Sequence, residues 1–281
     1  MDILSGTQFV KPESWELRQL LLPGGALLRS DLPELIKFTH QQGIVPVLLT
    51  NGSLLPQRWQ EMGESGLRYV IISIDSLKQD VYRVQRGLPL QVGLDALSAA
   101  KDMRAAFSGT HIHVTAVLTK ANLQDLPQMA RTLSNQDVWL QITPYHHFLD
   151  QKPDTFSPDT NYPVEQVICE LCTLKEQGVK IANSKAFLEH IPAFFRGKRV
   201  PDNYQCLAGC LALFVDAYMN VLPCWSQDFP PVGNIVRQKL KDIWQGDAFE
   251  KARTQMRACH CKGCWLLCAG ELTLLVQEKG D

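Results

Sequence analysis

The sequence predicts an α/β fold: a partial parallel β/α barrel joined to a small, cysteine-rich α+β domain. Two observations predict it. Between about residues 17 and 145, short runs of Val, Ile and Leu alternate with amphipathic stretches, whereas seven of the nine cysteines fall between Cys206 and Cys268. Apolar runs that alternate with helices are typical of right-handed βαβ crossovers in a parallel sheet. Clustered cysteines in a chain without secretory features indicate metal binding rather than disulfides.

Five apolar runs in the first region are expected to form strands. Each is bounded by Gly, Pro, Asn or Asp, and its length suits a strand that is buried on both faces of a parallel sheet. The runs are LRQLLL, IVPVLLT, YVIISID, IHVTAVLT and VWLQITP.

Helices are expected between these strands. One begins after Asp31, a candidate N-cap residue with Pro33 close behind, and stops at Gly43. A second is expected in LQDLPQMARTL, and a third in VEQVICELCTLKEQG. The third carries Cys169 and Cys172 three positions apart, and we interpret both as core residues because free cysteine is commonly buried.

The pattern changes after residue 200. The stretch LALFVDAYMNVLPCW predicts a short hairpin with its turn near Asp216–Asn220, and LKDIWQGDAFEKARTQM predicts one helix. We therefore expect a barrel core in residues 1–150, a helical connector in residues 151–200 and the cysteine-rich domain in residues 201–281.

Composition excludes several classes of protein. The formal net charge is −1, so no basic footprint for nucleic acid or for an anionic membrane is present. No basic start followed by an apolar run opens the sequence, and no apolar stretch reaches the length of a membrane span. The expected location is the cytoplasm, with no nucleic-acid or membrane partner.

The cysteines after residue 200 form a pattern typical of metal ligands. Cys261 and Cys264 make a C-x-x-C pair, and Cys206 and Cys224 flank the predicted hairpin, so two pairs supply four thiolates. Thiolates are soft ligands that suit both zinc and iron–sulfur clusters. Spacing alone is compatible with three alternatives: a zinc site, a 4Fe–4S cluster, or reduced cysteines that belong to the core and bind no metal.

This part of the chain resembles the auxiliary-cluster domain of radical S-adenosylmethionine (radical SAM) enzymes, known as SPASM or, when shorter, Twitch. The features that carry the resemblance occur in order: Cys206, Gly209, Asp216, Pro223-Cys224, Gly233-Asn234, Ile243-Trp244 and Cys261–Cys268. It implies an auxiliary 4Fe–4S cluster held by Cys206, Cys224, Cys261, Cys264 and Cys268. Met219 stands where the family usually has a turn glycine, and Cys210 and Cys259 are additional.

The first region resembles the radical SAM barrel itself. The segments that carry this resemblance are GGALLRSDLPELI, VLLTNGSLL, ISIDS and VTAVLTKAN. It implies a family that acts on peptides or cofactor precursors with an electron donor, and a bound S-adenosylmethionine near Gly24, Gly25, Ser73 and Asp75.

One family feature is missing from this sequence. The radical-generating cluster of the family is held by a C-x-x-x-C-x-x-C loop after the first strand, but no cysteine precedes Cys169 here, and Gly24-Gly25 is followed by Ala26. We therefore expect a barrel without its first strand and weak or no binding of S-adenosylmethionine by this chain. Two alternatives follow. One is an enzyme whose cysteine loop lies outside this sequence, and the other is a non-catalytic binding protein stabilised by an iron–sulfur cluster or by zinc.

Histidines and short polar residues give weaker signals. His146 and His147 follow the last strand and are interpreted as a solvated loop pair, although they could line the barrel mouth. His111 and His113 alternate on one strand and are expected near solvent at its end. For Ser73 and Asp75 the alternative to a ligand role is ordinary helix capping by Asp75 or Ser76.

Overall fold

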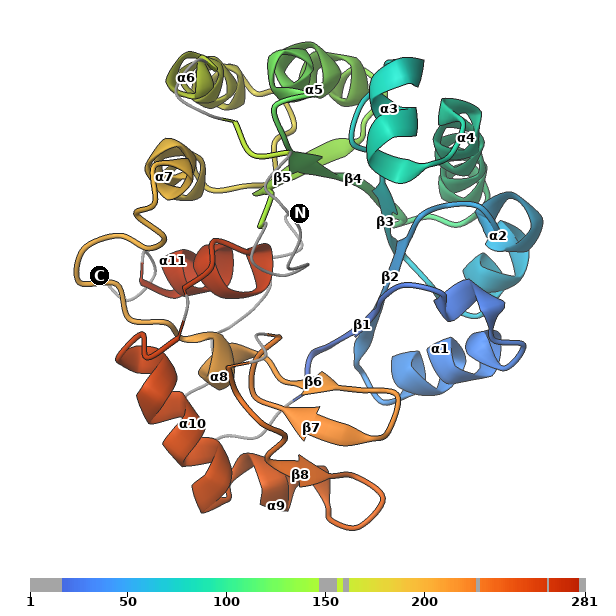
Figure 1. The fold of residues 1–281 in the computed structure, drawn as a ribbon. Helices are drawn as coiled ribbons and strands as arrows, with labels where there is room; N and C mark the ends of the chain where they lie inside the picture. Colours follow the sequence, from blue (N-terminus) through green and yellow to red (C-terminus); the bar gives the residue numbers. More distant parts are fainter. Residues whose placement is uncertain (1–16, 147–155, 159–161, 226–227, 262, 278–281) are drawn as a thin grey trace. The chain divides into compact units, whose positions relative to one another are not determined.

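The computed structural model describes residues 17–146, 156–158, 162–225, 228–261 and 263–277 (Figure 1). The chain divides into two compact units. Of the described residues, the first unit contains those up to Thr143 and Cys169–Ala182, and the second contains those between Pro144 and Ile168 and those from Asn183 onward.

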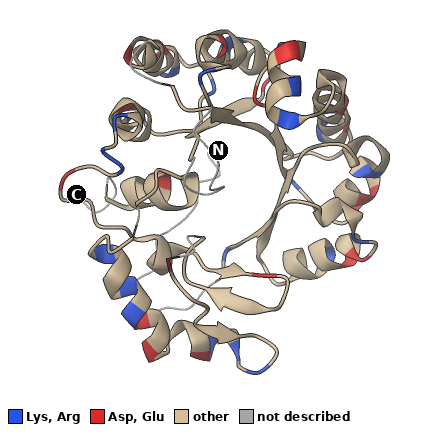
Figure 2. Cartoon of the chain, viewed as in Figure 1, with Lys and Arg blue, Asp and Glu red and all other residues tan. Residues whose placement is uncertain are grey.

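The first unit is built on a five-stranded sheet in the order β1-β2-β3-β4-β5. The first three strands each pair in parallel with the strand that follows in sequence. All five predicted strands are confirmed: β1 (Gln19–Leu22), β2 (Val45–Thr50), β3 (Tyr69–Ser73), β4 (His111–Leu118) and β5 (Trp139–Pro144). None of them contains Lys, Arg, Asp or Glu, and Figure 2 shows the charges of this unit mainly on its helices.

Strands β3 and β5 are fully buried on one face only. Val70 and Ile72 of β3 and Leu140 and Ile142 of β5 have no exposed surface, but the residues between them are partly exposed. The expectation that both faces are buried is therefore wrong for these strands. The reason is that the helices lie on the outer side of the arc of strands (Figure 1), so they cover one face.

Helices connect the strands as predicted. Their bounds are η1 (Ala26–Leu28), α1 (Leu32–Gln41), α2 (Leu55–Glu64), α3 (Gln79–Arg86), α4 (Leu90–Ala106), η2 (Leu123–Asp125) and α5 (Leu126–Ser134). Asp31 is the N-cap residue of α1, but its side chain makes no capping bond because it pairs with Arg29 instead. Gly43 follows α1 in the left-handed conformation that ends many helices.

Helix α6 (Val164–Glu176) is the predicted helix that carries Cys169 and Cys172. Cys172 is buried, which confirms its interpretation as a core residue, whereas Cys169 is exposed. Positions three apart on a helix lie on neighbouring but not identical parts of its surface, and here the boundary of the core passes between them.

The second unit combines short helices with a small antiparallel sheet. Its elements are α7 (Lys185–Phe195), α8 (Ala208–Leu211), β6 (Phe214–Val215), β7 (Asn220–Leu222), β8 (Gly233–Asn234), α9 (Leu240–Trp244), α10 (Asp247–Arg257), the π-helical turn η4 (Leu267–Glu271) and α11 (Leu272–Gln277). The predicted hairpin is confirmed as β6–β7. The single helix predicted for residues 240–256 is wrong, because Gly246 adopts an extended conformation and starts α10 anew.

A buried arginine joins three helices of this unit. Arg253 is 4% exposed and donates from Nε to the carbonyl of Gly209 in α8 and from Nη2 to the carbonyl of Trp244 in α9. Its guanidinium also lies 4.4 Å from the ring centre of Trp244 and 4.3 Å from that of Phe249. Arg253 therefore stabilises the packing of α8, α9 and α10 through charged hydrogen bonds and cation–π contacts.

The hairpin turn depends on Asp216 and on a strained residue. The Asp216 carboxylate accepts hydrogen bonds from the backbone amides of Tyr218 and Asn220 at 2.8 and 2.9 Å. Met219 has a φ of 64°, in the left-handed region where glycine is favoured. Met219 therefore replaces the usual glycine of the family at a position where any side chain strains the backbone.

We expect Met219→Gly to raise the free energy of unfolding of the second unit by about 0.5–1 kcal/mol, because it relieves this strain at some cost in unfolded-state entropy. Chemical denaturation of both proteins measures the difference. Met219→Val is the matched control and should lower stability, since a β-branched residue tolerates positive φ poorly. A glycine variant less stable than the valine variant would contradict the assignment of strain.

His113 is buried rather than solvated. It is 4% exposed on β4 and its ring stacks on Trp139 at 6.2 Å, so the expectation of a solvent position is wrong for this residue. Burial, together with the neighbouring His111, lowers the pKa of His113 to about 4. The imidazole is therefore neutral in the folded protein at physiological pH.

This burial predicts an acid-sensitive first unit. The pKa of His113 in the folded protein lies below the usual value of about 6.5, so the unfolded chain binds the proton first as the pH falls. The free energy of unfolding therefore decreases between about pH 6.5 and pH 4, by about 3 kcal/mol in total. Thermal unfolding between pH 7.5 and 4.5 measures the loss. His113→Phe should flatten this dependence relative to the parent, and an equally steep curve for the variant would contradict the prediction.

Within the part of the chain that the structure describes, no helix has both the length and the apolar character that crossing a membrane requires.

Candidate metal centre

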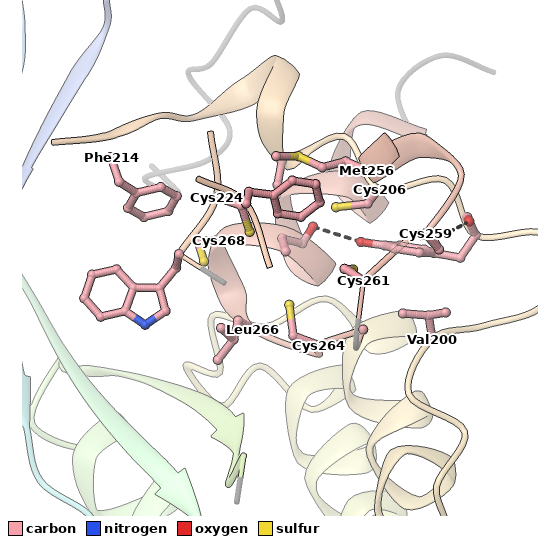
Figure 3. A pocket seen from close by; sticks show the side chains of 16 residues that line it. Val200, Cys206, Phe214, Cys224, Met256, Cys259, Cys261, Cys264, Leu266 and Cys268 are labelled. Carbon is pink, nitrogen blue, oxygen red and sulfur yellow. Dashed lines mark hydrogen bonds between the residues drawn. The ribbon is translucent and has the colours of Figure 1, made fainter. Parts of the chain in front are cut away.

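Six cysteine side chains line a single pocket of the second unit (Figure 3). They are Cys206, Cys224, Cys259, Cys261, Cys264 and Cys268. All six are free thiols that retain some accessible surface. In Figure 3 the sulfur atoms of all but Cys259 are turned toward the interior of the pocket. Residues separated by up to 62 positions in the sequence thus supply one set of soft donors.

Three segments of the chain bring these thiols together. Cys206 lies two residues before α8, and Cys224 lies two residues after β7. Cys261 and Cys264 belong to the segment that follows α10, and Cys268 lies in η4. The hairpin and the segment after α10 therefore supply thiols to the same pocket from two sides of the sequence.

The C-x-x-C turn requires glycine at position 263. Gly263 has a φ of 73°, and a Cβ atom added there would lie 3.1 Å from the Cβ of Arg199. A side chain at this position would strain the backbone and crowd its neighbour. Gly263 thus permits Cys261 and Cys264 to face the same pocket.

Four of the thiols form one interacting group, which we call the thiol tetrad: Cys206, Cys224, Cys264 and Cys268. Burial raises the pKa of Cys206 to about 11 and that of Cys268 to about 12, and it raises the pKa of Cys264 as well. Repulsion between thiolates contributes to these shifts for each pair within the tetrad. Without a cation, Cys206, Cys264 and Cys268 therefore stay protonated at neutral pH.

The backbone around the pocket favours thiolates locally. The pKa of Cys206 is raised mainly by burial, but the amide of Ala208, two residues on, donates to this sulfur and opposes the shift. The amide of Leu266 acts in the same way on Cys264. Amides placed two residues after a cysteine supply donors to a metal-bound thiolate, so the chain is shaped for ligation.

Cys261 lies beside the tetrad. Burial raises its pKa, with Cys259 adding to the shift and with Arg199 and the amide of Gly263 opposing it. Its side chain packs with those of Cys206 and Cys224 against a small apolar cluster that contains Met256. Cys261 is therefore a fifth thiol in reach of the pocket, in line with the five residues that the resemblance implies.

The two additional cysteines have other partners. The Cys259 thiol donates to the carbonyl of Tyr204 at 3.3 Å, and Cys259 ends α10 with a φ of 52°. The sulfur of Cys210, which does not line the pocket, accepts a hydrogen bond from Arg257 at 3.2 Å. Neither sulfur is directed at the tetrad, so both are poorer ligand candidates.

Aromatic and apolar side chains form the remaining wall of the pocket. Phe214 and Trp225 meet edge to face with ring centres 5.9 Å apart, and Phe229, Met256 and Leu266 line the pocket beside the thiols. Such a wall limits water around the sulfurs. Shielding of this kind controls solvent access and the potential of a metal group.

The four residues suggested for S-adenosylmethionine lie along one edge of the sheet of the first unit. Gly24 and Gly25 follow β1, Ser73 ends β3, and Asp75 comes two residues later. Both glycines are exposed, and a Cβ added at Gly24 would contact nothing within 4 Å. This edge holds the carboxyl ends of the parallel strands, where open α/β sheets bind ligands.

Asp75 is engaged within the protein. It is 3% exposed; its Oδ1 accepts hydrogen bonds from Arg86 Nη2 at 2.9 Å and from the amide of Val117 at 2.8 Å, while Oδ2 lies 2.6 Å from Arg86 Nε. Neither Asp75 nor Ser76 caps a helix, because α3 begins at Gln79 with Lys78 as its N-cap. The Asp75 carboxylate thus already has a cationic partner.

His146 contacts the residue that directly follows Cys264, a link that the sequence reasoning missed. It is 4% exposed, so the expectation of a solvated loop is wrong, and its Nε2 accepts a hydrogen bond from the amide of Trp265. His147 lies outside the described residues. The position of His146 directly after a strand indicated that it could have a role at a site. Its hydrogen-bond partner, Trp265, lies 119 positions away and could not be identified from the sequence.

Comparison with known proteins agrees with this geometry. Residues 206–265 match the model of the SPASM family, described as an iron–sulfur cluster-binding domain. The "AdoMet-dependent heme synthase" of Methanosarcina barkeri is 25% identical over 262 residues, covering 83% of this chain and 70% of the relative. Residues 206–265 thus form a SPASM domain, and the chain as a whole is similar to radical SAM proteins.

Solved structures agree with the fold of this chain. "Native anSMEcpe with bound AdoMet" superposes with a TM-score of 0.58 at 15% identity and covers 89% of this chain and 70% of that one. "Native anSMEcpe with bound AdoMet and Kp18Cys peptide" gives a TM-score of 0.56. At this identity the likeness concerns the fold alone.

Other relatives match over shorter stretches. The "GTP 3',8-cyclase" of Marinobacter nauticus is 33% identical over 111 residues, which cover 39% of this chain and 33% of the relative. The "Fe-coproporphyrin III synthase" of Methanosarcina barkeri is 27% identical over 123 residues, 42% of this chain and 29% of the relative. The chain thus matches about a third of the length of these two enzymes.

The SPASM match contains most of the thiol site. Cys206, Cys224, Cys259, Cys261 and Cys264 fall within residues 206–265, and Cys268 lies three positions beyond. An iron–sulfur cluster needs soft thiolate donors in a shielded pocket, and the residues present fit that requirement.

Proposed function

We propose that the SPASM domain of this protein holds one auxiliary 4Fe–4S cluster on the thiol tetrad, with Cys261 as the fifth candidate ligand. The observation that carries the proposal is the mutual electrostatic interaction of the four tetrad thiols within one pocket. Four protonated thiols repel one another when they ionise, and a multivalent iron cluster offsets that repulsion. When bound, the cluster supplies one-electron transfer.

The arrangement favours a cluster over a single zinc ion. Zinc needs four ligands about 2.0–2.3 Å from one point. Here six thiols line one pocket, more than a single zinc ion would bind. Thiols that surround a hollow suit a cluster better, because each thiolate then binds a different iron.

We propose that the protein takes part in the maturation of a peptide or of a cofactor precursor, with an electron donor as partner. Support comes from similar enzymes, among them a heme synthase and an Fe-coproporphyrin III synthase, and from a solved structure of similar fold with a bound peptide. The aromatic wall of Phe214 and Trp225 would keep water from the cluster during electron transfer. We place the protein in the cytoplasm, where free thiols persist.

We further propose that this chain, as given, does not cleave S-adenosylmethionine. No cysteine precedes Cys169, so the three-cysteine loop of the family is not in this sequence. Gly24, Gly25 and Ser73 lie at the edge of the sheet where such a ligand would sit, but Asp75 is paired with Arg86. The non-catalytic alternative, a cluster-bearing binding protein, is favoured by the same observation.

The test is anaerobic purification of the full chain, followed by iron, sulfide and zinc analysis, an absorption spectrum and an assay for 5′-deoxyadenosine under strong reductant. We expect a brown protein with about four irons and a broad band near 400 nm, as one such cluster requires, and no 5′-deoxyadenosine above a protein-free blank. A colourless protein with one zinc would overturn the cluster. Formation of 5′-deoxyadenosine would overturn the second proposal.

A further inference from the structure

The imidazole of His146 has a defined hydrogen-bonding role on each nitrogen. Its Nδ1 lies 2.6 Å from the carbonyl oxygen of Pro144, and its Nε2 lies 2.9 Å from the backbone nitrogen of Trp265. A carbonyl only accepts and an amide only donates. The ring is therefore the neutral tautomer with its proton on Nδ1 and a lone pair on Nε2.

The amide that His146 accepts lies next to the thiol tetrad. Trp265 directly follows Cys264, and the next amide in the chain, that of Leu266, donates to the Cys264 sulfur. The first peptide after Cys264 is thus bound by the imidazole and the second by the thiol. Holding the first peptide plane restricts the second, because the two share one pair of backbone torsions.

Trp265 is itself held rigidly. It has no exposed surface, its ring stacks on Phe187 with centres 5.2 Å apart, and its indole nitrogen donates to the Phe187 carbonyl at 2.9 Å. His190 contacts the same ring with centres 4.4 Å apart, whereas the Trp265 amide donates to His146. The backbone of the turn after Cys264 therefore depends on His146 in a way that the other contacts of Trp265 do not reproduce.

We propose that His146 is a positioning residue for the auxiliary cluster. By accepting a hydrogen bond from the Trp265 amide, it keeps the Cys264–Leu266 turn in the conformation that directs the Leu266 amide at the Cys264 sulfur. This inference rests on the proposed function, since Cys264 must be a cluster ligand. A hydrogen bond to a ligand sulfur withdraws charge and raises the reduction potential of a cluster. His146 thus tunes the potential from two residues beyond the end of β5.

The test uses the full chain with its cluster and three variants. His146→Phe keeps a ring that can pack against Phe194, which lies 4.7 Å from the imidazole, but removes the acceptor. His146→Gln restores an acceptor at a similar distance from the backbone. His190→Phe is the matched control, because it changes the other histidine on Trp265 without touching the amide.

We expect His146→Phe to have a more negative midpoint potential, altered EPR g values in the reduced cluster and about fivefold faster iron release to a chelator, as expected for one lost hydrogen bond. His146→Gln should recover most of these properties, and His190→Phe should match the parent. A folded His146→Phe protein with an unchanged or raised potential overturns the inference.

Two measurements keep the test decisive. If His146→Phe fails to fold, NMR spectra of the parent labelled with ¹⁵N-histidine provide the test. The signal that is absent from His146→Gln belongs to His146, and it must be that of a neutral imidazole protonated at Nδ1. The opposite tautomer overturns the inference. If the parent itself holds no iron–sulfur cluster, the proposed function fails instead. The two failures are therefore distinguishable.

Discussion

Replacing Cys224 by alanine is expected to abolish binding of the auxiliary cluster and to open the second unit to protease. Cys224 interacts electrostatically with the three other thiols of the tetrad and joins the hairpin to the segment after α10. A small domain with one hairpin and a few short helices buries little apolar surface, so metal binding supplies much of its stability. The loss of one thiolate also exposes the remaining irons to water and oxygen.

Iron content and limited proteolysis of the region after residue 200 measure this effect. Two other cysteines serve as controls. Cys210→Ala removes a half-buried thiol of the same unit that does not line the pocket, and Cys172→Ala removes a core thiol from α6. Both should keep full iron, with only a minor cavity cost for Cys172. Full iron and full protease resistance in Cys224→Ala would show that the ligand set must be chosen again, with Cys261 and then Cys259 as candidates.

Arg253→Met is expected to lower the free energy of unfolding of the second unit by about 3 kcal/mol or more, because charged hydrogen bonds and buried cation–π contacts are lost together. The methionine fills a similar volume but leaves the carbonyls of Gly209 and Trp244 without their buried donor. An added Cβ at Gly209 would lie 2.9 Å from the sulfur of Met256, so α8 packs closely on α10 here. Loss of the guanidinium should therefore also disturb Cys206, two residues before α8.

Denaturant unfolding of metal-free protein isolates this contribution from that of the cluster. Lys251→Met, an exposed change on the same helix, is the matched control and should shift stability by less than about 0.5 kcal/mol. Arg253→Lys should rescue poorly, since an ammonium cannot reach both carbonyls and stack on two rings. Equal stabilities for the methionine and lysine variants and the parent would contradict the role assigned to Arg253.

The sheet was predictable from local composition. A strand in an open β/α layer needs a short apolar run with a turn residue at each end, and each of the five runs carries that signal by itself. The helix break at Gly246 was not predicted, because the apolar spacing of Ile243, Trp244 and Phe249 continues through it. Periodicity reports which positions are buried, whereas a change in backbone direction between two short helices depends on what they pack against.

The site divides in the same way. The pairs Cys206–Cys224 and Cys261–Cys264 were recognisable because their spacing and their resemblance to SPASM are properties of the chain itself. The pairing of Asp75 with Arg86, the burial of His113 and the bond from Trp265 to His146 were not, because each depends on a partner brought close by folding. The sequence by itself was enough to predict the strands, the resemblance to radical SAM/SPASM proteins and a set of soft donors. Only the tertiary structure decided which thiols share a pocket and which polar side chains already have a partner within the protein. The reason is that hydrogen bonds and electrostatic repulsion act between groups a few ångströms apart in space, which can be far apart in the sequence.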